Sequence, residues 1–211
     1  MDLRIGIDDL LMATYDNYDV YGYCITQILS FLNREGFEER IEYVVSEYIG
    51  DEFDLITNRT LRKQIEGRQK LKVGTIAPDI QIPDINRDKV GLHDLFKKNK
   101  LNLVMFWSST CPHCMETIPE IKTIYESYRS AGLEVIAVSI DKKKDEWQQA
   151  IDQENLEWIN ISSLKGWDSE STDVYYVSYT PTFYLVDNQT TIVGRPDGKE
   201  DVIRMLNNLL R

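Results

Sequence analysis

The stretch LNLVMFWSSTCPHC, residues 101–114, decides the fold of this chain. Its first half, Leu101–Trp107, is an almost continuous apolar run with the length of a buried β-strand. Three small polar residues follow, and then comes the sequence Cys111-Pro112-His113-Cys114. Proline is favoured in the first turn of a helix, where no backbone N–H is needed. The stretch therefore predicts a buried strand, a short turn and a helix that begins at the two cysteines.

This placement of the cysteines predicts a reactive pair. A sulfur at a helix N-terminus faces unpaired backbone N–H groups and the positive end of the helix dipole, which favour the thiolate and lower its pKa. The two-residue spacing puts Cys114 one turn after Cys111, within bonding reach and buried enough to act second. The pattern indicates thiol–disulfide exchange without a metal or a cofactor other than the Cys111–Cys114 disulfide. His113 is either a further influence on the thiolate or a tolerated turn residue.

The sequence around this stretch predicts an α/β domain over residues 73–211. A short edge strand is expected at residues 80–82, between two prolines, and a buried strand at residues 133–140. The helix that starts at the cysteines is expected to end at Gly132. A polar helix near residues 145–153, two strands at residues 182–186 and 191–193, and a last helix at residues 200–210 complete the pattern.

Residues 1–72 are predicted to form a small helical domain and a linker. Apolar residues recur at helical spacing in two runs, with Gly36 and Gly50 as stop signals, and a shorter helix is expected to end in the charged linker at residues 66–74. The two apolar runs comprise Tyr21, Cys24, Ile25, Ile28 and Leu32, and then Phe37, Ile41, Val44 and Tyr48. Cys24 lies on an apolar helix face and is expected to be a small buried residue rather than a reactive thiol.

Length and charge narrow the class of protein. The 211 residues suit two unequal domains, and 35 acidic against 24 basic residues give a net charge of −11. An acidic surface without a basic cluster argues against nucleic acid or an anionic membrane as the main partner. No apolar run is long enough to span a bilayer, and Met1-Asp2-Leu3-Arg4 lacks the features of a secretion signal. A leader or anchor that had been removed would be compatible with this start.

From about residue 72 onward the chain resembles the thioredoxin superfamily, specifically the TlpA/ResA-like envelope proteins grouped near AhpC/TSA. The Cys-X-X-Cys after a strand carries the resemblance, together with Thr180-Pro181-Thr182 before a strand, which resembles the family's cis-proline loop. Pro119 resembles the proline that bends the active-site helix, and the segment between Ile140 and Ser178 resembles an insertion of this branch. The helical domain resembles those fused to such proteins in some bacteria.

The resemblance implies a thioredoxin-like fold, a central mixed sheet flanked by helices, preceded by a small all-α domain. It also implies a thiol-disulfide oxidoreductase with cysteine-containing protein substrates and a redox partner that recycles the disulfide. Thr180 and Pro181 are expected to line the substrate site, because such a loop pairs with an extended segment like an added strand. Trp107 belongs to the expected active-site environment. The implied location is the bacterial periplasm or cell envelope, with the cytoplasm as the alternative.

Departures from the family pattern bear on proton transfer and on whether the cysteine pair oxidises or reduces its substrates. Thioredoxin has a buried aspartate six residues before its first active-site cysteine, and Met105 stands there in this chain. ResA-like proteins resemble one another in a glutamate three residues after the second cysteine, whereas this chain has Thr117 there and Glu116 one place earlier, which makes Glu116 a candidate acid–base substitute. The tetrad itself resembles that of the oxidant DsbA, while the domain resembles proteins that mostly reduce, so both directions stay open.

Three other functions fit the sequence less well. A peroxiredoxin-like peroxidase would need a threonine and a proline where the chain has Ser108 and Val104. A closed zinc site wants four ligands, and Cys24, His93 and His113 are poorly spaced to join the cysteine pair. A non-catalytic binding module on a thioredoxin scaffold has no use for an intact Cys-X-X-Cys. Thiol–disulfide exchange is therefore the predicted function.

Overall fold

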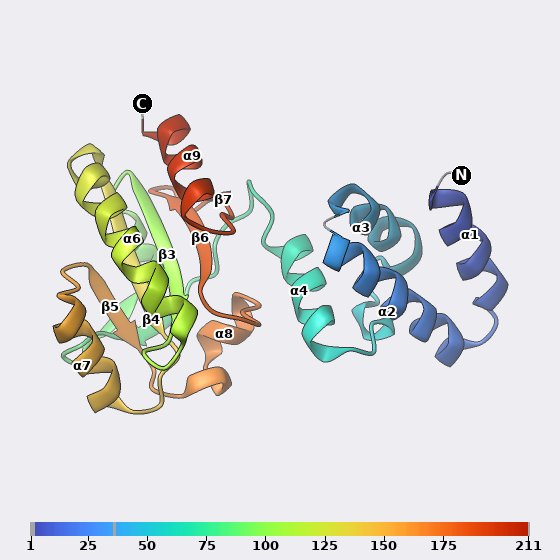
Figure 1. The fold of residues 1–211 in the computed structure, drawn as a ribbon, viewed down its shortest axis with the longest axis horizontal. Coiled ribbons are helices and arrows are strands. Elements are labelled where there is room, and N and C mark those ends of the chain that lie inside the picture. The colour runs from blue at the N-terminus through green and yellow to red at the C-terminus, as the bar shows by residue number, and fades with distance from the viewer. Residues whose placement is uncertain (1–2, 36, 211) are drawn as a thin grey trace. The chain divides into compact units, whose positions relative to one another are not determined.

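The computed structural model describes residues 3–35 and 37–210, and the chain divides into two compact units, Met1–Glu66 and Gly67–Arg211 (Figure 1). The division falls within helix α4 (Arg59–Lys70). The domain boundary predicted after residue 72 lies beyond the end of this helix and stays a prediction.

The first unit is built from helices. They are α1 (Leu3–Thr14), α2 (Tyr18–Glu35), α3 (Glu38–Val44) continued by a π-helical turn (Val45–Ile49), a 3-10 turn (Phe53–Leu55) and α4. Their apolar faces share one core, in which Ile25, Leu29 and Ile65 are fully buried. The Asp8 carboxylate accepts hydrogen bonds from the hydroxyls of Tyr43 (2.7 Å) and Tyr48 (2.6 Å), which ties α1 to the α3 segment.

Three sequence predictions for the helical part of the chain, residues 3–35 and 37–70, need correction. Residues 66–70 are helical rather than linker, because Arg68, Gln69 and Lys70 are good helix formers and Gly67 is tolerated. Cys24 is half-buried rather than buried, since it lies at the edge of the apolar face of α2. Phe37 is exposed because it precedes α3, so the helical period does not govern it. Gly36 lies outside the described residues.

The second unit is an α/β domain around a five-stranded mixed sheet in the order β5-β4-β3-β6-β7. The strands are β3 (Leu101–Trp107), β4 (Leu133–Ser139), β5 (Ile159–Ser162), β6 (Thr182–Asp187) and β7 (Ile192–Gly194). β3, β4 and β5 are parallel, whereas β6 and β7 run antiparallel to their neighbours. The predicted thioredoxin-like sheet is thereby confirmed, with β3 at its centre (Figure 1).

Both faces of this sheet are covered, which explains the continuous apolar run of β3. Leu101, Leu103, Met105 and Trp107 point to a core shared with α6 (Pro112–Tyr128), α7 (Lys144–Glu154) and α9 (Lys199–Leu209). Val104 and Phe106 point to the other core, which includes α5 (Leu92–Phe96). Side chains alternate across a strand, so a strand that is buried on both faces must be apolar throughout. Asn102 is the polar exception, and its side-chain amide donates to the carbonyls of Phe96 (3.0 Å) and Val186 (3.2 Å).

The strand predicted at residues 80–82 as an edge of the sheet forms its ladder in a separate sheet instead. β1 (Gln81–Pro83) forms a separate two-stranded antiparallel sheet with β2 (Lys89–Gly91), and α5 follows directly. The cause is the turn between the strands, where the Asp84 carboxylate accepts backbone N–H bonds from Asn86 (2.8 Å) and Asp88 (2.9 Å). This turn folds the chain back into the hairpin, which meets the main sheet at an isolated bridge between Asp84 and Ile161 of β5. Helix α8 (Glu170–Val174) lies in the segment between β5 and β6.

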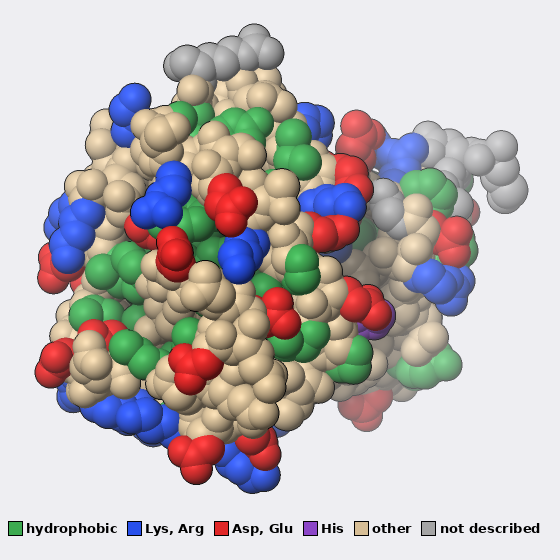
Figure 2. Space-filling view, turned by 60° about the vertical axis from the view of Figure 1, so that its left-hand side comes forward, with side chains coloured by type: hydrophobic (Ala, Val, Ile, Leu, Met, Phe, Trp, Pro, Cys, Tyr) green, Lys and Arg blue, Asp and Glu red, His purple; other side chains and the backbone are tan. Residues whose placement is uncertain are grey.

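The surface agrees with the charge pattern of the sequence. Figure 2 shows acidic and basic side chains interspersed over the face it presents, without a continuous basic area on that face. Within residues 3–35 and 37–210, no helix combines the length and the apolar character that crossing a membrane requires.

We expect Leu103→Ala to destabilise the second unit by about 2–5 kcal/mol, because it deletes a fully buried side chain at the centre of the sheet. Urea denaturation followed by tryptophan fluorescence tests this, since all four tryptophans lie between residues 107 and 167 and report on this unit alone. Leu209→Ala is the matched control: its side chain is 43% exposed, so a shift of about 0.5 kcal/mol or less is expected. Equal losses in the two variants would contradict the described core.

Candidate active site

The site is built where β3 ends and α6 begins. After Trp107 the chain makes a short turn, in which the Cys111 backbone N–H donates to the Ser108 carbonyl (3.1 Å). Cys111 is extended (φ −89°, ψ 112°) and caps α6, and Pro112 occupies the first helical position. The predicted strand, turn and helix over residues 101–114 are confirmed.

The sulfur of Cys111 takes the place of a capping oxygen. Its Sγ atom accepts the backbone N–H of Cys114 at 3.3 Å and lies 3.5 Å from the Thr180 carbonyl oxygen, to which the thiol can donate. Capping groups that accept helix N–H bonds are stabilised as anions by the partial positive charge of the N-terminus, about half an elementary charge. The Cys111 side chain is half-buried, which leaves the sulfur accessible.

The two sulfurs have opposite acid–base character. Burial alone would raise the pKa of Cys111, but hydrogen bonds from the Cys114 and Thr180 side chains and from the backbone N–H groups of Cys114 and His113 outweigh it and lower that pKa. Burial first, and then the hydrogen bond and charge of Cys111, raise the pKa of Cys114 to about 12. The geometry therefore favours the thiolate on Cys111 over a thiolate on Cys114, which is buried and protonated at neutral pH.

Thr180 and Pro181 reach the sulfurs through the sheet. β6 pairs with β3 antiparallel, with Thr182 opposite Phe106, so the loop before β6 lies beside the end of β3. The Thr180–Pro181 peptide bond is cis, as the resemblance to a cis-proline loop implied. The loop therefore places a backbone carbonyl against the Cys111 sulfur.

The other predicted site residues are the buried Trp107 and the exposed pair His113 and Glu116. Trp107 is fully buried beneath the turn, and its indole N–H has no hydrogen-bond partner among the described residues. His113 and Glu116 are both highly exposed, and the His113 Nδ1 atom lies 3.6 Å from a Glu116 carboxylate oxygen. Glu116 therefore lies beside His113. Within the described part of the chain, neither the Cys111 sulfur nor the Cys114 sulfur has a hydrogen bond to Glu116.

Asp141 is a site residue that the sequence pattern did not identify. Its carboxylate accepts hydrogen bonds from residues of the active-site turn. Asp141 is 4% exposed and follows β4, which runs parallel to β3 and ends beside it. Its carboxylate accepts bonds from the hydroxyls of Ser108 (2.9 Å), Ser109 (2.8 Å) and Ser139 (2.7 Å) and from the Ser109 backbone N–H (3.1 Å). A polar residue directly after a buried parallel strand was the signal that could have revealed it, because such strand ends meet at one edge of the sheet.

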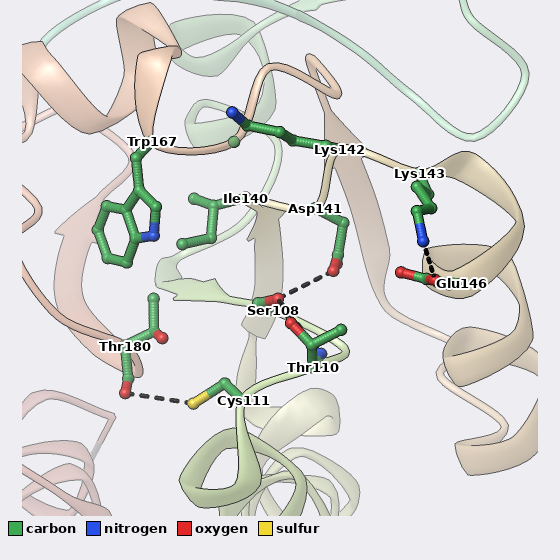
Figure 3. A pocket seen from close by; sticks show the side chains of 11 residues that line it. Ser108, Thr110, Cys111, Ile140, Asp141, Lys142, Lys143, Glu146, Trp167 and Thr180 are labelled. Carbon is green, nitrogen blue, oxygen red and sulfur yellow. Dashed lines mark hydrogen bonds and ion pairs between the residues drawn. The ribbon is translucent and has the colours of Figure 1, made fainter.

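A pocket of about 410 Å3 opens beside Cys111. Figure 3 shows Trp167 and Thr180 on one side of it, Ile140 and Asp141 across the middle, and the Lys143–Glu146 ion pair (2.7 Å) on the other side. The remaining lining residues are Ser108, Thr110, Lys142 and Gly166. Groups of three or more histidine, cysteine, aspartate or glutamate side chains positioned for a metal ion do not occur among residues 3–35 and 37–210. The arrangement can carry out nucleophilic sulfur chemistry next to a small cavity.

Comparisons with known proteins point to the same chemistry. A family model described as the AhpC/TSA family matches residues 73–195. Thiol-disulfide oxidoreductase ResA of Bacillus cereus is 26% identical over 133 residues, which cover 63% of this chain and 74% of that protein. ResA of Bacillus subtilis is 26% identical over 147 residues, which cover 69% of this chain and 79% of that protein. The crystal structure of the thioredoxin domain of a Bacteroides vulgatus thiol-disulfide oxidoreductase matches with a TM-score of 0.61 at 26% identity, covering 67% of this chain and 99% of that one.

We expect iodoacetamide to alkylate Cys111 at neutral pH and to leave Cys114 unmodified in the same sample, because the first pKa is lowered and the second is raised to about 12. The thiolate fraction falls as pH falls through the pKa, so a lowered pKa extends the reactivity of Cys111 to lower pH. Peptide mapping by mass spectrometry across a pH series measures both rates. A midpoint for Cys111 at or above that of a free cysteine peptide would contradict this electrostatic description.

We expect Asp141→Ala to destabilise the second unit by about 2–3 kcal/mol and to slow the alkylation of Cys111, because buried donors at the turn lose a charged acceptor. Asp141→Asn keeps one acceptor oxygen and should lie between the two. Asp168→Asn serves as the control for stability, since the Asp168 side chain is 83% exposed and its ion pair with Lys142 contributes little. Urea denaturation and the alkylation assay together measure the effect, and an unchanged stability of Asp141→Ala would refute the supporting role.

Proposed function

The chain belongs to the AhpC/TSA family and is a thiol-disulfide oxidoreductase of the TlpA/ResA-like branch, and from this premise we propose that it exchanges disulfides with cysteine-containing proteins through Cys111 and Cys114. The observation that carries the proposal is the Cys111 sulfur at the cap of α6, with its lowered pKa and its contacts to Cys114 and Thr180. No cofactor other than the disulfide of this pair takes part.

The first step is attack by the Cys111 thiolate on one sulfur of a substrate disulfide. A new S–S bond joins Cys111 to the substrate, the substrate's own S–S bond breaks, and the leaving sulfur departs as a thiolate that takes a proton from solvent. The half-buried position of Cys111 suits this step, because it exposes the sulfur to a partner and keeps the helix N–H bond that stabilises the anion.

Cys114 resolves the mixed disulfide. Its thiol loses a proton to solvent, and its sulfur attacks the Cys111 sulfur, which breaks the S–S bond between Cys111 and the substrate. The substrate leaves as a second thiolate, so that two electrons have passed to the substrate and the Cys111–Cys114 disulfide remains. Burial, and then the hydrogen bond and the charge of Cys111, raise the pKa of Cys114 and keep it a thiol, and the contribution of the charge is gone once Cys111 is part of a mixed disulfide. Oxidation of a substrate runs through the same steps in reverse.

The substrate segment lies along the Thr180–Pro181 loop in this proposal. The Thr180 carbonyl faces the Cys111 sulfur at 3.5 Å, so a backbone that pairs with this loop as an added strand would bring its own cysteine to the nucleophile. Trp107 and Pro112 shape the start of the helix, and the His113 backbone N–H contributes to the lowered pKa of Cys111. Glu116 serves as an acid–base group through its proximity to His113.

The partner that recycles the pair sets the direction of the reaction. A lowered pKa of Cys111 stabilises the dithiol form, and this stabilisation raises the reduction potential of the pair. Equilibration with glutathione redox buffers measures that potential and distinguishes an oxidant from a reductant.

The ResA-like resemblance supports the periplasm or cell envelope as the location of the protein. Fractionation of cells that express the protein would distinguish this location from the cytoplasm.

We expect Cys111→Ser to reduce the turnover of insulin disulfides to the uncatalysed rate, because the attacking thiolate is gone. Cys114→Ser should still attack and should accumulate mixed disulfides with its substrates, visible as dithiothreitol-sensitive adducts on non-reducing gels. Cys24→Ser is the matched control and should keep wild-type turnover. Loss of turnover in Cys24→Ser, or rapid hydrogen peroxide consumption by the wild type in place of disulfide exchange, would overturn the proposal.

A further inference from the structure

We propose that the pocket beside Cys111 binds an uncharged apolar side chain of the substrate, two residues from the reacting cysteine, and that Trp167 is the residue that selects it. This inference rests on the proposed function, because it concerns which protein disulfides the same sulfur attacks. It specifies the class of substrate segment that the site prefers.

The size and position of the pocket suit a substrate side chain. Its volume of about 410 Å3 lies in the lower part of the range for small-molecule sites and has room for an aromatic side chain with its flanking backbone. Cys111 and Thr180 form part of its lining, so the cavity is continuous with the atoms that a substrate must approach (Figure 3). A segment bound there is held within reach of the nucleophile.

Trp167 offers the pocket an indole that is 47% exposed, whereas Trp107, Trp147 and Trp158 are buried. Single exposed apolar residues are common on protein surfaces, so exposure alone would mean little. Trp167 is distinguished by its place in the wall of a cavity that adjoins the reactive sulfur (Figure 3). An apolar group that covers this ring gains burial on both partners.

The turn that presents Trp167 is held firmly. Gly166 has φ +63°, and a Cβ atom there would meet the Lys142 Cε atom at 2.4 Å, so the chain packs tightly against the Lys142 side chain. The Trp167 carbonyl accepts the Thr172 hydroxyl (2.9 Å), and the Ser169 backbone N–H donates to the Gly166 carbonyl (3.2 Å). These contacts fix the backbone from which the Trp167 ring projects, so less backbone entropy is lost on binding.

The charges around the pocket favour an uncharged occupant. Both lysines of the lining have carboxylate partners, Lys142 with Asp168 and Lys143 with Glu146. The buried Asp141 carboxylate is already engaged by serine hydroxyls and a backbone N–H. An acidic side chain would have to compete for paired cations, and a basic one would find its carboxylates occupied, so the apolar surface of Trp167 and Ile140 is the remaining source of affinity.

The geometry of an added strand specifies the position. In an extended segment, residues i and i+2 point to the same face and lie about 6.6 Å apart, while residues i±1 point to the opposite face. When the substrate cysteine faces Cys111, the side chain that can enter a cavity beside Cys111 on the same face belongs to the residue two positions away.

Single-turnover reduction of defined peptides tests the inference. Glycine–serine peptides carry one central cysteine, joined to 2-mercaptoethanol as a mixed disulfide, with phenylalanine, alanine or aspartate placed at each of the positions ±1 and ±2. Pre-reduced enzyme supplies both electrons, and chromatography follows the free peptide thiol. We expect the wild type to reduce a peptide with phenylalanine at one of the ±2 positions about tenfold faster than the alanine peptide, with no such preference at ±1.

Trp167→Ala should lower this preference to about twofold or less, and Trp167→Phe should retain most of it. Tyr179→Ala is the matched control, because Tyr179 is 51% exposed next to the same loop and does not line the pocket, and it should keep the preference. Reduction of hydroxyethyl disulfide, which has no apolar side chain for the pocket to select, should be unchanged in all these variants.

Three results would overturn the inference while leaving the proposed function in place: an unchanged preference in Trp167→Ala, a preference for aspartate, or a preference at ±1. A wild-type enzyme that fails to reduce hydroxyethyl disulfide as well as the peptides would instead overturn the proposed function, and this inference with it.

Discussion

The hydrogen bond from the Cys114 backbone N–H to the Cys111 sulfur is the interaction on which the site depends. It exists because an apolar strand delivers the chain to a helix N-terminus, where backbone donors have no partner within the helix. A sulfur in that place is favoured as an anion, and the next sulfur, one turn later, is buried in the core and kept protonated. One local geometry thereby separates the two thiols into an attacking and a resolving group.

The sheet brings the remaining parts of the site together from distant positions in the sequence. β4 runs parallel to β3 and delivers Asp141 to the underside of the turn, and β6 runs antiparallel to β3 and delivers Thr180 to the sulfur. The segment between β5 and β6 adds Trp167 to the wall of the pocket. The chemistry of the pair is thus local, whereas its support and its proposed selectivity come from tertiary contacts.

Some features were predictable because their causes lie close together in the chain. The strand, turn and helix over residues 101–114 follow from an apolar run, a proline at the first helical position and the cysteine spacing. The cis bond before Pro181 was predictable from a family resemblance rather than from local physics. The separate β1–β2 hairpin was not foreseen, since the bonds of the Asp84 carboxylate that form its turn are not visible as a periodic pattern.

The cysteine pair at a helix start and the two kinds of fold were predictable from the chain alone, because helical period, strand burial and helix capping depend on residues within a few positions of one another. The bonds of Asp141 to the turn, the place of Glu116 beside His113 and that of Trp167 in the pocket of Cys111 follow from tertiary contacts instead. These relations depend on which strand ends meet at the edge of the sheet and on the path of the segment between β5 and β6. The pairing of β3 with β4 and with β6 joins residues more than thirty positions apart, and no local pattern specifies it.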